Sequence, residues 1–459
     1  MNIFKINRSE IRNRLEPKFY SLKYLDNEKK IDKSPYSVRK LSEISILISD
    51  GTHFTPKYQS FGKIFLSVKD VRASNIDYSN SMFISDEEFE ILNRRCKPQK
   101  NDILLTKIGS IGFAAVVETN EDFQIFVSLA LIRPKTWCVL PYYLEFILNS
   151  NLSYLQFDRC LKGAGVPDLH LEEIRNIKIP LPPLSVQQNI VDLYTNAQNQ
   201  RKIKLEESKK LLESVDDCLL SELGIELPQK DNSLKNRIFK VSSFQLLGTR
   251  WDCSSNKNDF SLSSKKFKNV KLCDVVNINP SVHFPSNIEE ITFIPMEAID
   301  EEYGEITSNY RKKVSESAGF TRFMQGDLIW AKITPCMQNG KSAIVKKTIN
   351  GYVCGSTEFF VLRCNKNKIY VNYLFYIMHL KKLLEYATNF FGGNAGQQRV
   401  SKDFLLNLEI PLPPLSKQTE IASRLQQIQN QAKQLKNEAD MILQETKQKI
   451  EKMILGEEQ

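Results

Sequence analysis

The sequence predicts an α+β protein built from two copies of one unit, in which a mixed α/β domain leads into a long helix. The main observation is a heptapeptide, Ile-Pro-Leu-Pro-Pro-Leu-Ser, found at 179–185 and again at 410–416, a shift of 231 residues (410 minus 179). Other segments match in the same order, and apolar residues at helical spacing follow each copy. A period this long indicates a duplicated domain and not a solenoid of short repeats.

The match extends over most of each half. Each heptapeptide is followed by a Gln two residues on (Gln187, Gln418) and an Ile three residues later (Ile190, Ile421). The shift varies from 225 (102 to 327) to 236 (15 to 251), so loops differ in length while the framework persists. The other paired segments are 14–16 with 250–252, 38–44 with 270–275, 101–108 with 326–333, 131–133 with 361–363, 143–144 with 373–374, and 163–165 with 394–396.

The first part of each half is predicted to be mostly strands, because short Val, Ile and Phe runs are broken by Gly, Asn, Asp and Pro. One helical stretch at 141–160 matches 371–390, with apolar residues at helical spacing in both. Final strands are expected at 177–179 and 408–410, ended by the prolines of the heptapeptide.

A long helix follows each heptapeptide. Ser185 is expected to be the N-cap of the first helix, with Gln188 completing a capping box, and Ser416 the N-cap of the second. Leu-Gly ends both helices, at Gly224 and Gly456, where glycine supplies the left-handed C-cap. Each helix would be roughly 55–60 Å long at 1.5 Å per residue.

The second helix carries a heptad seam, which predicts a helical partner. The first helix is less regular, with Arg201, Lys204 and Ser208 in its stripe. We expect the two helices to form an antiparallel coiled coil about a pseudo-two-fold axis, with one globular domain at each end. The alternative is that each helix packs on its own domain. The seam residues are Ile421, Leu425, Ile428, Ala432, Leu435, Ala439, Ile442, Ile450 and Ile454.

The predicted boundaries follow from these elements. The first domain spans 1–184 and its helix 185–224; a linker at 225–246 leads to the second domain at 247–415 and its helix at 416–459.

Composition narrows the class of protein. The 459 residues contain 41% hydrophobic and 25% charged side chains, as in ordinary globular proteins. No apolar run is long enough for a membrane span and no secretory signal begins the chain, which favours the cytoplasm. The nine cysteines include no Cys-x-x-Cys pair and are expected to be reduced. A net charge of +9 fits nucleic-acid binding but is a weak signal.

Catalytic motifs are missing from the sequence. There is no G-x-G-x-x-G, and Asn339-Gly340-Lys341-Ser342 ends like a P-loop but has Pro335 where the first glycine belongs. Asp168 with Glu172 and Glu173 resembles a nuclease carboxylate cluster only weakly, and a helix start explains these acids better. His170 and His379 are expected to serve packing. We therefore predict no catalytic or metal site.

Two variable α/β domains that each lead through this heptapeptide into a long heptad helix resemble the specificity subunit of type I restriction–modification enzymes, over nearly the whole chain. The resemblance implies that each domain is a target recognition domain reading one half of a bipartite double-stranded DNA sequence. It implies that the helices set the gap between the half-sites and bind two modification subunits, which methylate adenine. Restriction subunits join that core, and no cofactor belongs to this chain. S-adenosylmethionine, ATP and Mg²⁺ are expected in the partner subunits.

Candidate DNA-contacting residues lie on polar loops where basic side chains stand beside glycine, which lets the backbone approach phosphate. Gln and Asn suit adenine and Arg suits guanine in the major groove. The alternative for each residue is a solvated loop or structural turn, and the matched Lys107 and Lys332 rank above the others. The candidates are Thr52, His53, Lys57, Lys69, Arg72, Lys107, Ser110, Lys162, Gly163, Gly165, His283, Lys332, Thr334, Lys341, Gly393, Asn394, Gln397, Gln398 and Arg399.

Two other functions remain open on the residues alone. One is a non-catalytic coiled-coil scaffold with two peptide-binding domains, whose concave faces would not share a basic lining. The other is a self-contained nuclease or methyltransferase, which requires an acidic or nucleotide-binding cluster.

Overall fold

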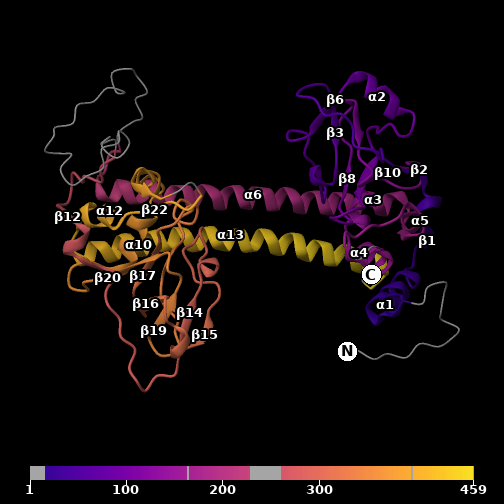
Figure 1. Ribbon diagram of the computed structural model, residues 1–459. Coiled ribbons are helices and arrows are strands. Elements are labelled where there is room, and N and C mark those ends of the chain that lie inside the picture. The colour runs from indigo at the N-terminus through magenta and orange to yellow at the C-terminus, as the bar shows by residue number, and fades with distance from the viewer. Residues whose placement is uncertain (1–15, 163–164, 228–259, 394–395, 458–459) are drawn as a thin grey trace. The chain divides into compact units, whose positions relative to one another are not determined.

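The computed structural model describes residues 16–162, 165–227, 260–393 and 396–457, which fall into two compact units (Figure 1). Unit 1 comprises the described residues up to 203 together with those from 438 onward, and unit 2 comprises 204–437. Most of the predicted linker at 225–246, and the paired segments 14–15 and 250–252, lie outside the described residues.

Each unit has a four-stranded antiparallel main sheet of the same topology. In unit 1 the order is β2-β10-β7-β8, and in unit 2 it is β13-β20-β17-β18. The shared order confirms the duplication predicted from the heptapeptide. The strands of unit 1 are β2 (Ser45–Asp50), β10 (Leu129–Pro134), β7 (Ile103–Thr106) and β8 (Ala114–Val116). Those of unit 2 are β13 (Val276–Ile278), β20 (Phe359–Cys364), β17 (Leu328–Ala331) and β18 (Ser342–Ile344).

A second, mixed sheet differs between the units. It has the order β6-β3-β9 in unit 1 and β15-β14-β19-β16 in unit 2, and each includes one parallel pair. The strands are β6 (Met82–Ile84), β3 (Lys63–Leu66), β9 (Phe123–Ile125), β15 (Tyr310–Lys313), β14 (Glu290–Ile294), β19 (Tyr352–Gly355) and β16 (Thr321–Met324). The remaining pairs are β1 (Ser37–Lys40) with β11 (Lys178–Leu181), β12 (Asn269–Lys271) with β23 (Glu409–Pro411), β4 (Val71–Arg72) with β5 (Asn75–Ile76), and β21 (Phe391–Gly392) with β22 (Arg399–Val400).

The helical stretch predicted at 141–160 is two helices, α3 (Pro141–Leu148) and α4 (Asn151–Cys160). Ser150 interrupts them with an extended backbone (φ −80°, ψ 161°). Unit 2 has the same break between α10 (Val371–His379) and α11 (Lys381–Ala387). The shorter helices are α1 (Leu22–Asp32), α2 (Asp86–Asn93), α5 (Leu171–Arg175) and α12 (Lys402–Asn407).

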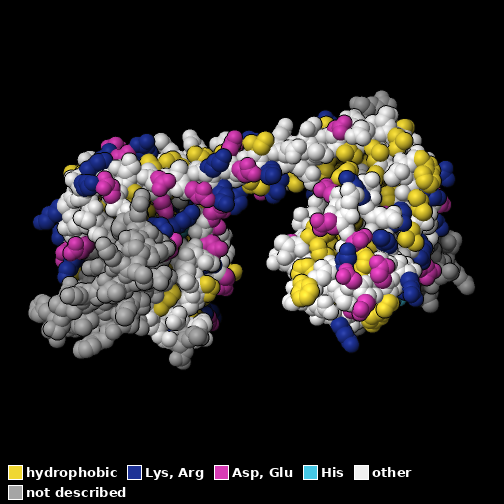
Figure 2. Space-filling model, turned by 90° about the horizontal axis from the view of Figure 1, so that it is seen from above, with side chains coloured by type: hydrophobic (Ala, Val, Ile, Leu, Met, Phe, Trp, Pro, Cys, Tyr) yellow, Lys and Arg dark blue, Asp and Glu magenta, His cyan; other side chains and the backbone are white. Residues whose placement is uncertain are grey.

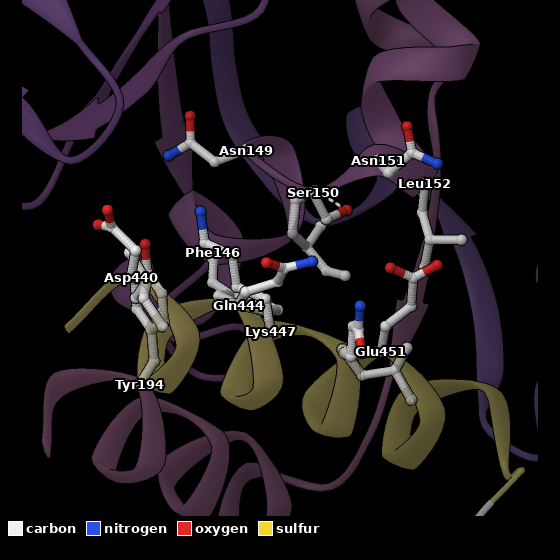
Figure 3. A pocket seen from close by; sticks show the side chains of 14 residues that line it. Phe146, Asn149, Ser150, Asn151, Leu152, Tyr194, Asp440, Gln444, Lys447 and Glu451 are labelled. Atoms are coloured by element: carbon white, nitrogen blue, oxygen red, sulfur yellow. Dashed lines mark hydrogen bonds between the residues drawn. The ribbon is translucent and has the colours of Figure 1, made fainter. Parts of the chain in front are cut away.

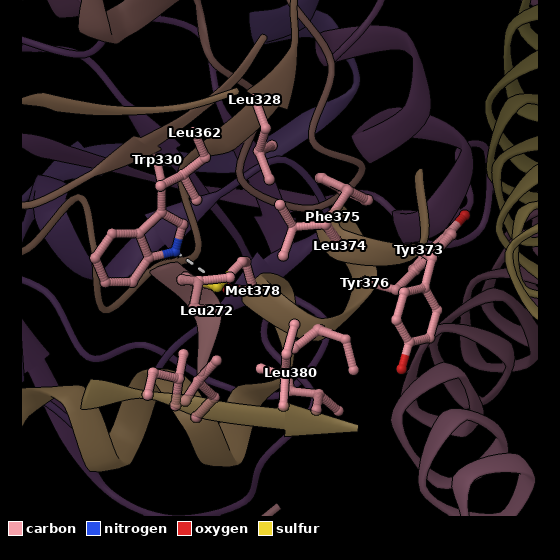
Figure 4. Packing of buried hydrophobic residues seen from close by; sticks show 14 of the residues in the cluster. Leu272, Leu328, Trp330, Leu362, Tyr373, Leu374, Phe375, Tyr376, Met378 and Leu380 are labelled. Carbon is pink, nitrogen blue, oxygen red and sulfur yellow. Dashed lines mark hydrogen bonds between the residues drawn. The ribbon is translucent and has the colours of Figure 1, made fainter. Parts of the chain in front are cut away.

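The main core of unit 2 packs α10 and α11 against the main sheet. Figure 4 shows Trp330 among Leu328, Leu362 and the side chains of α10. The indole N–H donates to the carbonyl of Met378 at 3.1 Å, so this buried ring keeps its polar group paired.

The two long helices are α6 (Leu184–Leu223) and α13 (Leu415–Leu455). Both end at the predicted glycine, with φ of 62° at Gly224 and 72° at Gly456. The capping prediction was wrong, because each helix begins one residue before its serine. The carbonyl of Pro183, and not the Ser185 side chain, accepts the first N–H groups, from Val186 (2.9 Å) and Gln187 (3.0 Å).

Within each unit the segments of α6 and α13 pair antiparallel, as the seam predicted. In unit 1, Lys447 lies over the ring of Tyr194, and Arg201 pairs with Asp440 at 3.2 Å. In unit 2, the buried Ser208 donates to the carbonyl of Ala432 at 2.7 Å. Residue numbers thus rise along one helix as they fall along the other. Ser208, predicted to interrupt the seam, is one of its contacts.

The duplicated glutamines perform the same task in both units. Gln187 accepts from the N–H of Leu140 (2.8 Å) and donates to the carbonyls of Cys138 (3.0 Å) and Pro182 (2.8 Å). Gln418 makes the equivalent bonds in unit 2, and both residues have no exposed surface. Each glutamine therefore fastens a long helix to the loop that precedes α3 or α10.

Candidate nucleic-acid interface

In both units some candidate residues closely follow a main-sheet strand: Thr52 and His53 follow β2, Lys107 follows β7, and Lys332 follows β17. In unit 1, the loop after β2 begins at Gly51, whose position brings its backbone against Ile125. A Cβ atom built on Gly51 would lie 1.9 Å from the Ile125 carbonyl oxygen, so only glycine fits. Thr52 is buried behind it, and His53 is exposed.

Charged side chains meet at this edge, and we call Asp50, Lys107 and Asp168 the unit 1 cluster. Lys107 Nζ lies 3.7 Å from Asp50 Oδ2 and 3.7 Å from Asp168 Oδ1. The Lys107 side chain is only 5% exposed, which is tolerable for an ammonium because two carboxylates face it. Lys107 therefore holds three chain segments together, and its charge is largely neutralised within the protein.

Three further side chains extend this cluster outward. Arg95 pairs with Asp50 and lies 2.9 Å from His53 Nε2, while His170 Nε2 lies 3.5 Å from Asp168. These outer groups are half exposed. The packing role predicted for His170 is therefore wrong, since it is exposed beside Asp168. His379 is partly buried and packs against the ring of Phe375, as predicted, with Nδ1 3.1 Å from the Ser342 hydroxyl.

The equivalent edge of unit 2 has different chemistry, and we call Lys332, Glu358 and Arg399 the unit 2 cluster. Arg399 Nε donates to Glu358 Oε2 at 2.9 Å and Nη2 donates to Oε1 at 2.8 Å. These bonds lower the pKa of Glu358 from its usual range, so the carboxylate is ionised at neutral pH. Lys332 lies over the Phe360 ring, 5.6 Å from its centroid, and remains partly exposed.

The structure brings several predicted residues together. Thr334, Gln398 and Arg399 are neighbours in unit 2, because the Thr334 N–H donates to the Gln398 carbonyl (3.0 Å) and Ile333 forms a bridge with Arg399. In unit 1, Lys162 forms a bridge with Asp168 and an ion pair with Glu173. The exposed candidates are Lys69, Arg72, Ser110, Gly165, His283, Gly393 and Gln397.

Two candidates are tied elsewhere, and two cannot be placed. The Lys57 backbone N–H donates to the carboxylate of Glu88 on α2, and the Lys341 ammonium faces the Met296 carbonyl at 3.4 Å. Gly163 and Asn394 lie outside the described residues. None of these placements tests DNA contact, so the candidates remain predictions.

Sequence reasoning missed Arg95 and Glu358. Each is far along the chain from its partner, and only the fold makes them neighbours. The only sequence signal for Glu358 was Arg399, which was predicted to lie near DNA. An arginine on a loop needs no acidic partner, so Arg399 did not indicate that a glutamate lies beside it.

Charges of both signs mix over the surface. Figure 2 shows Lys and Arg side chains lying among Asp and Glu on the visible face of each unit. The described residues contain no group of three or more His, Cys, Asp or Glu side chains that could hold a metal ion. Over 16–162, 165–227, 260–393 and 396–457, every helix is too short or too polar to cross a lipid bilayer.

The sequence matches a known protein family twice. Residues 33–213 and 264–442 each match the family described as "Type I restriction modification DNA specificity domain". These ranges coincide with the two repeats found in the sequence.

Curated relatives and solved structures agree with this match. The chain is 33% identical over 153 residues to the type I restriction enzyme EcoEI specificity subunit of Escherichia coli, an alignment that covers 33% of this chain and only 26% of that protein. It is 24% identical over 435 residues to the putative type I restriction enzyme MjaX specificity subunit of Methanocaldococcus jannaschii, covering 92% of both. A chain from a structure of an assembled type I R-M system superposes with a TM-score of 0.56 at 17% identity, over 92% of this chain and 97% of that one, which shows a common fold.

Proposed function

Because the chain belongs to the specificity subunits of type I restriction–modification systems, we propose that it reads a bipartite DNA sequence, one half with each unit, and performs no chemistry itself. The observation that carries the proposal is the difference between the unit 1 cluster and the unit 2 cluster. They occupy the same place in two copies of one fold but carry different side chains, as two readers of different half-sites require. A single small domain reads too few base pairs to distinguish its target from the many competing sites in a genome. When two such domains are linked, binding of the first raises the effective concentration of the second at its half-site, so the pair binds more tightly.

The paired helices provide a fixed separation in this proposal. DNA advances roughly 34–36 Å per turn, so a stiff spacer rejects half-sites at the wrong gap. Insertion of one heptad in both helices, after Lys210 and after Glu438, should alter the tolerated gap and leave both half-sites unchanged. An unchanged gap would refute the spacer role.

The helices also present matched pockets, which we assign to two modification subunits. In unit 1, a pocket of about 400 Å³ lies between the α3–α4 junction and α13 and is lined by Tyr194, Leu443 and Lys447 (Figure 3). In unit 2, a pocket of about 480 Å³ uses the α10–α11 junction with Leu212 and Asp216. Leu443 and Leu212 differ by 231 residues, the shift between the heptapeptides. Two equivalent pockets suit two copies of one partner, the modification subunit, which would bind S-adenosylmethionine. Restriction subunits would bind ATP and Mg²⁺.

The experiment is footprinting of the chain with its modification subunits on random-sequence DNA. We expect protection of an asymmetric, interrupted site, with affinity that falls steeply as salt rises because phosphate contacts release counterions. Replacing residues 38–178 with the first domain of another family member should change one half-site only. Failure to retain DNA at low salt, with the partner present, would refute the proposal, and methyl transfer by the isolated chain would contradict its non-catalytic role.

A further inference from the structure

The unit 1 cluster and the unit 2 cluster carry opposite charges at one matched position, that of Asp168 and Arg399. The Leu169 N–H donates to the Lys107 carbonyl at 2.8 Å in unit 1, and the Val400 N–H donates to the Lys332 carbonyl at 2.9 Å in unit 2. The preceding residues, Asp168 and Arg399, therefore occupy the same place in the fold. Unit 1 has a carboxylate at this position and unit 2 has a guanidinium.

Arg399 is held in one orientation with donors to spare. Nε and Nη2 donate to the two oxygens of Glu358, and Nη1 donates to the carbonyl of Gln397 at 2.9 Å. Because a guanidinium has five N–H groups, two remain: one on Nη1 and one on Nη2. The side chain is 41% exposed, so solvent or a ligand can reach this end.

Two other arginine–carboxylate pairs show what a framework pair looks like. Arg133 donates through Nε and Nη2 to Asp102, and Arg363 does the same to Asp327, with all four bonds at 2.8 Å. Both carboxylates are buried, and the pairs lie at matched positions of the repeat. A pair present in both units cannot distinguish two sequences.

The Arg399–Glu358 pair has no such counterpart. The Lys332 N–H donates to the Glu358 carbonyl, and the matching Lys107 N–H donates to the carbonyl of Ser128. Unit 1 therefore has a serine in place of the glutamate and Asp168 in place of the arginine. The pair belongs to unit 2 alone, as a sequence-specific reader would.

We infer that Arg399 reads a guanine in the major groove of the half-site bound by unit 2, with Glu358 as the residue that positions it; this rests on the proposed function. Two adjacent N–H donors of arginine match O6 and N7 of guanine, and no other base presents that pair of acceptors there. Because Glu358 fixes the fork before binding, less side-chain entropy is lost on contact. Guanine should be preferred about 5- to 150-fold over another base at that position.

The test uses the full chain in complex with its modification subunits, selecting bound duplexes from a randomised library. The wild-type complex should require guanine at one base pair of one half-site. Arg399→Ala removes both donors, so this preference should vanish while the other half-site stays unchanged. Glu358→Gln should relax the same base pair and no other. Arg311→Gln, which removes an exposed arginine paired with Glu290 elsewhere in unit 2, is the matched control and should change no preference.

The outcomes distinguish a failure of this inference from a failure of the proposed function. Retained guanine preference in Arg399→Ala would overturn the inference while the proposed function stands. So would an Arg399→Gln variant that weakens all sequences equally and lowers the salt slope by about 1, because that is the signature of a phosphate contact. A wild-type complex that selects no sequence would overturn the proposed function and this inference together. Unchanged melting temperatures would exclude misfolding as the cause of altered preference.

Discussion

Truncation of the buried glutamine that follows the heptapeptide should destabilise one unit and spare the other. Gln187→Ala removes three hydrogen bonds, each worth about 1 kcal/mol net. It also leaves the partly buried Leu140 N–H without its partner, which costs about 1–3 kcal/mol more. The sum predicts a loss of about 4–6 kcal/mol from the free energy of unfolding of unit 1.

The assay is amide hydrogen exchange on the full chain, because a protein with two compact units need not unfold in one step. Gln187→Ala should lower protection in α3 and in the first turns of α6. Gln418→Ala should do the same in α10 and in the first turns of α13. Gln188→Ala is the control, since the Gln188 side chain is exposed and bonds only Asp192 at 2.8 Å, and its effect should stay within about 0.5 kcal/mol.

A different pattern would refute the reasoning. If Gln187→Ala costs less than about 1 kcal/mol, the buried carboxamide does not fasten the helix to the loop. If each variant lowers protection equally in both units, the two fastenings are not independent of each other.

Three further predictions concern stability. Burial lowers the pKa of His379 to about 4, below its unfolded value near 6.5. Unit 2 should therefore lose up to about 3 kcal/mol of stability as pH falls from 6.5 to 4, because the unfolded chain binds a proton that the folded unit does not. His379→Asn should abolish this loss, measured by urea unfolding at pH 7 and pH 4.5. Ser208→Ala removes the bond to the Ala432 carbonyl and should cost about 1 kcal/mol in thermal unfolding, whereas a cost near zero would mean that this bond makes no net contribution to stability. Gly51→Ala places a Cβ against the Ile125 carbonyl and should cost about 3 kcal/mol by calorimetry, and wild-type stability would contradict the close approach.

The architecture could be predicted from the sequence because its signals are repeated and regular. The heptapeptide, the heptad seam of α13 and the terminal glycines each constrain the backbone directly, and the structure confirms the helices and their antiparallel pairing. The start of α6 was predicted wrongly because a backbone carbonyl accepts the hydrogen bonds that the serine side chain was expected to accept. Ser185 looked like an N-cap, but the carbonyl of Pro183 starts the helix one residue earlier.

The partners of the site residues could not be predicted, because they depend on which strands are neighbours. Lys107 was ranked above most other candidates for DNA contact, yet it is buried between Asp50 and Asp168, which precede and follow it by more than fifty residues. Likewise Glu358 meets Arg399 only through the hairpin that follows α11. Sequence periodicity indicates which face of a strand is buried, but it does not indicate which ionic groups share one edge.

The division of the chain has a consequence for synthesis on the ribosome. Unit 2 is continuous, so all of its residues are available once position 437 has been translated. Unit 1 starts earlier but takes Ile450, Ile454 and Leu455 into its core. At about 5–20 residues per second, the domain made first must wait until position 455 has been translated to close its interior. Unit 2 is thus the first unit whose whole sequence has been synthesised, while unit 1 still lacks three residues of its core.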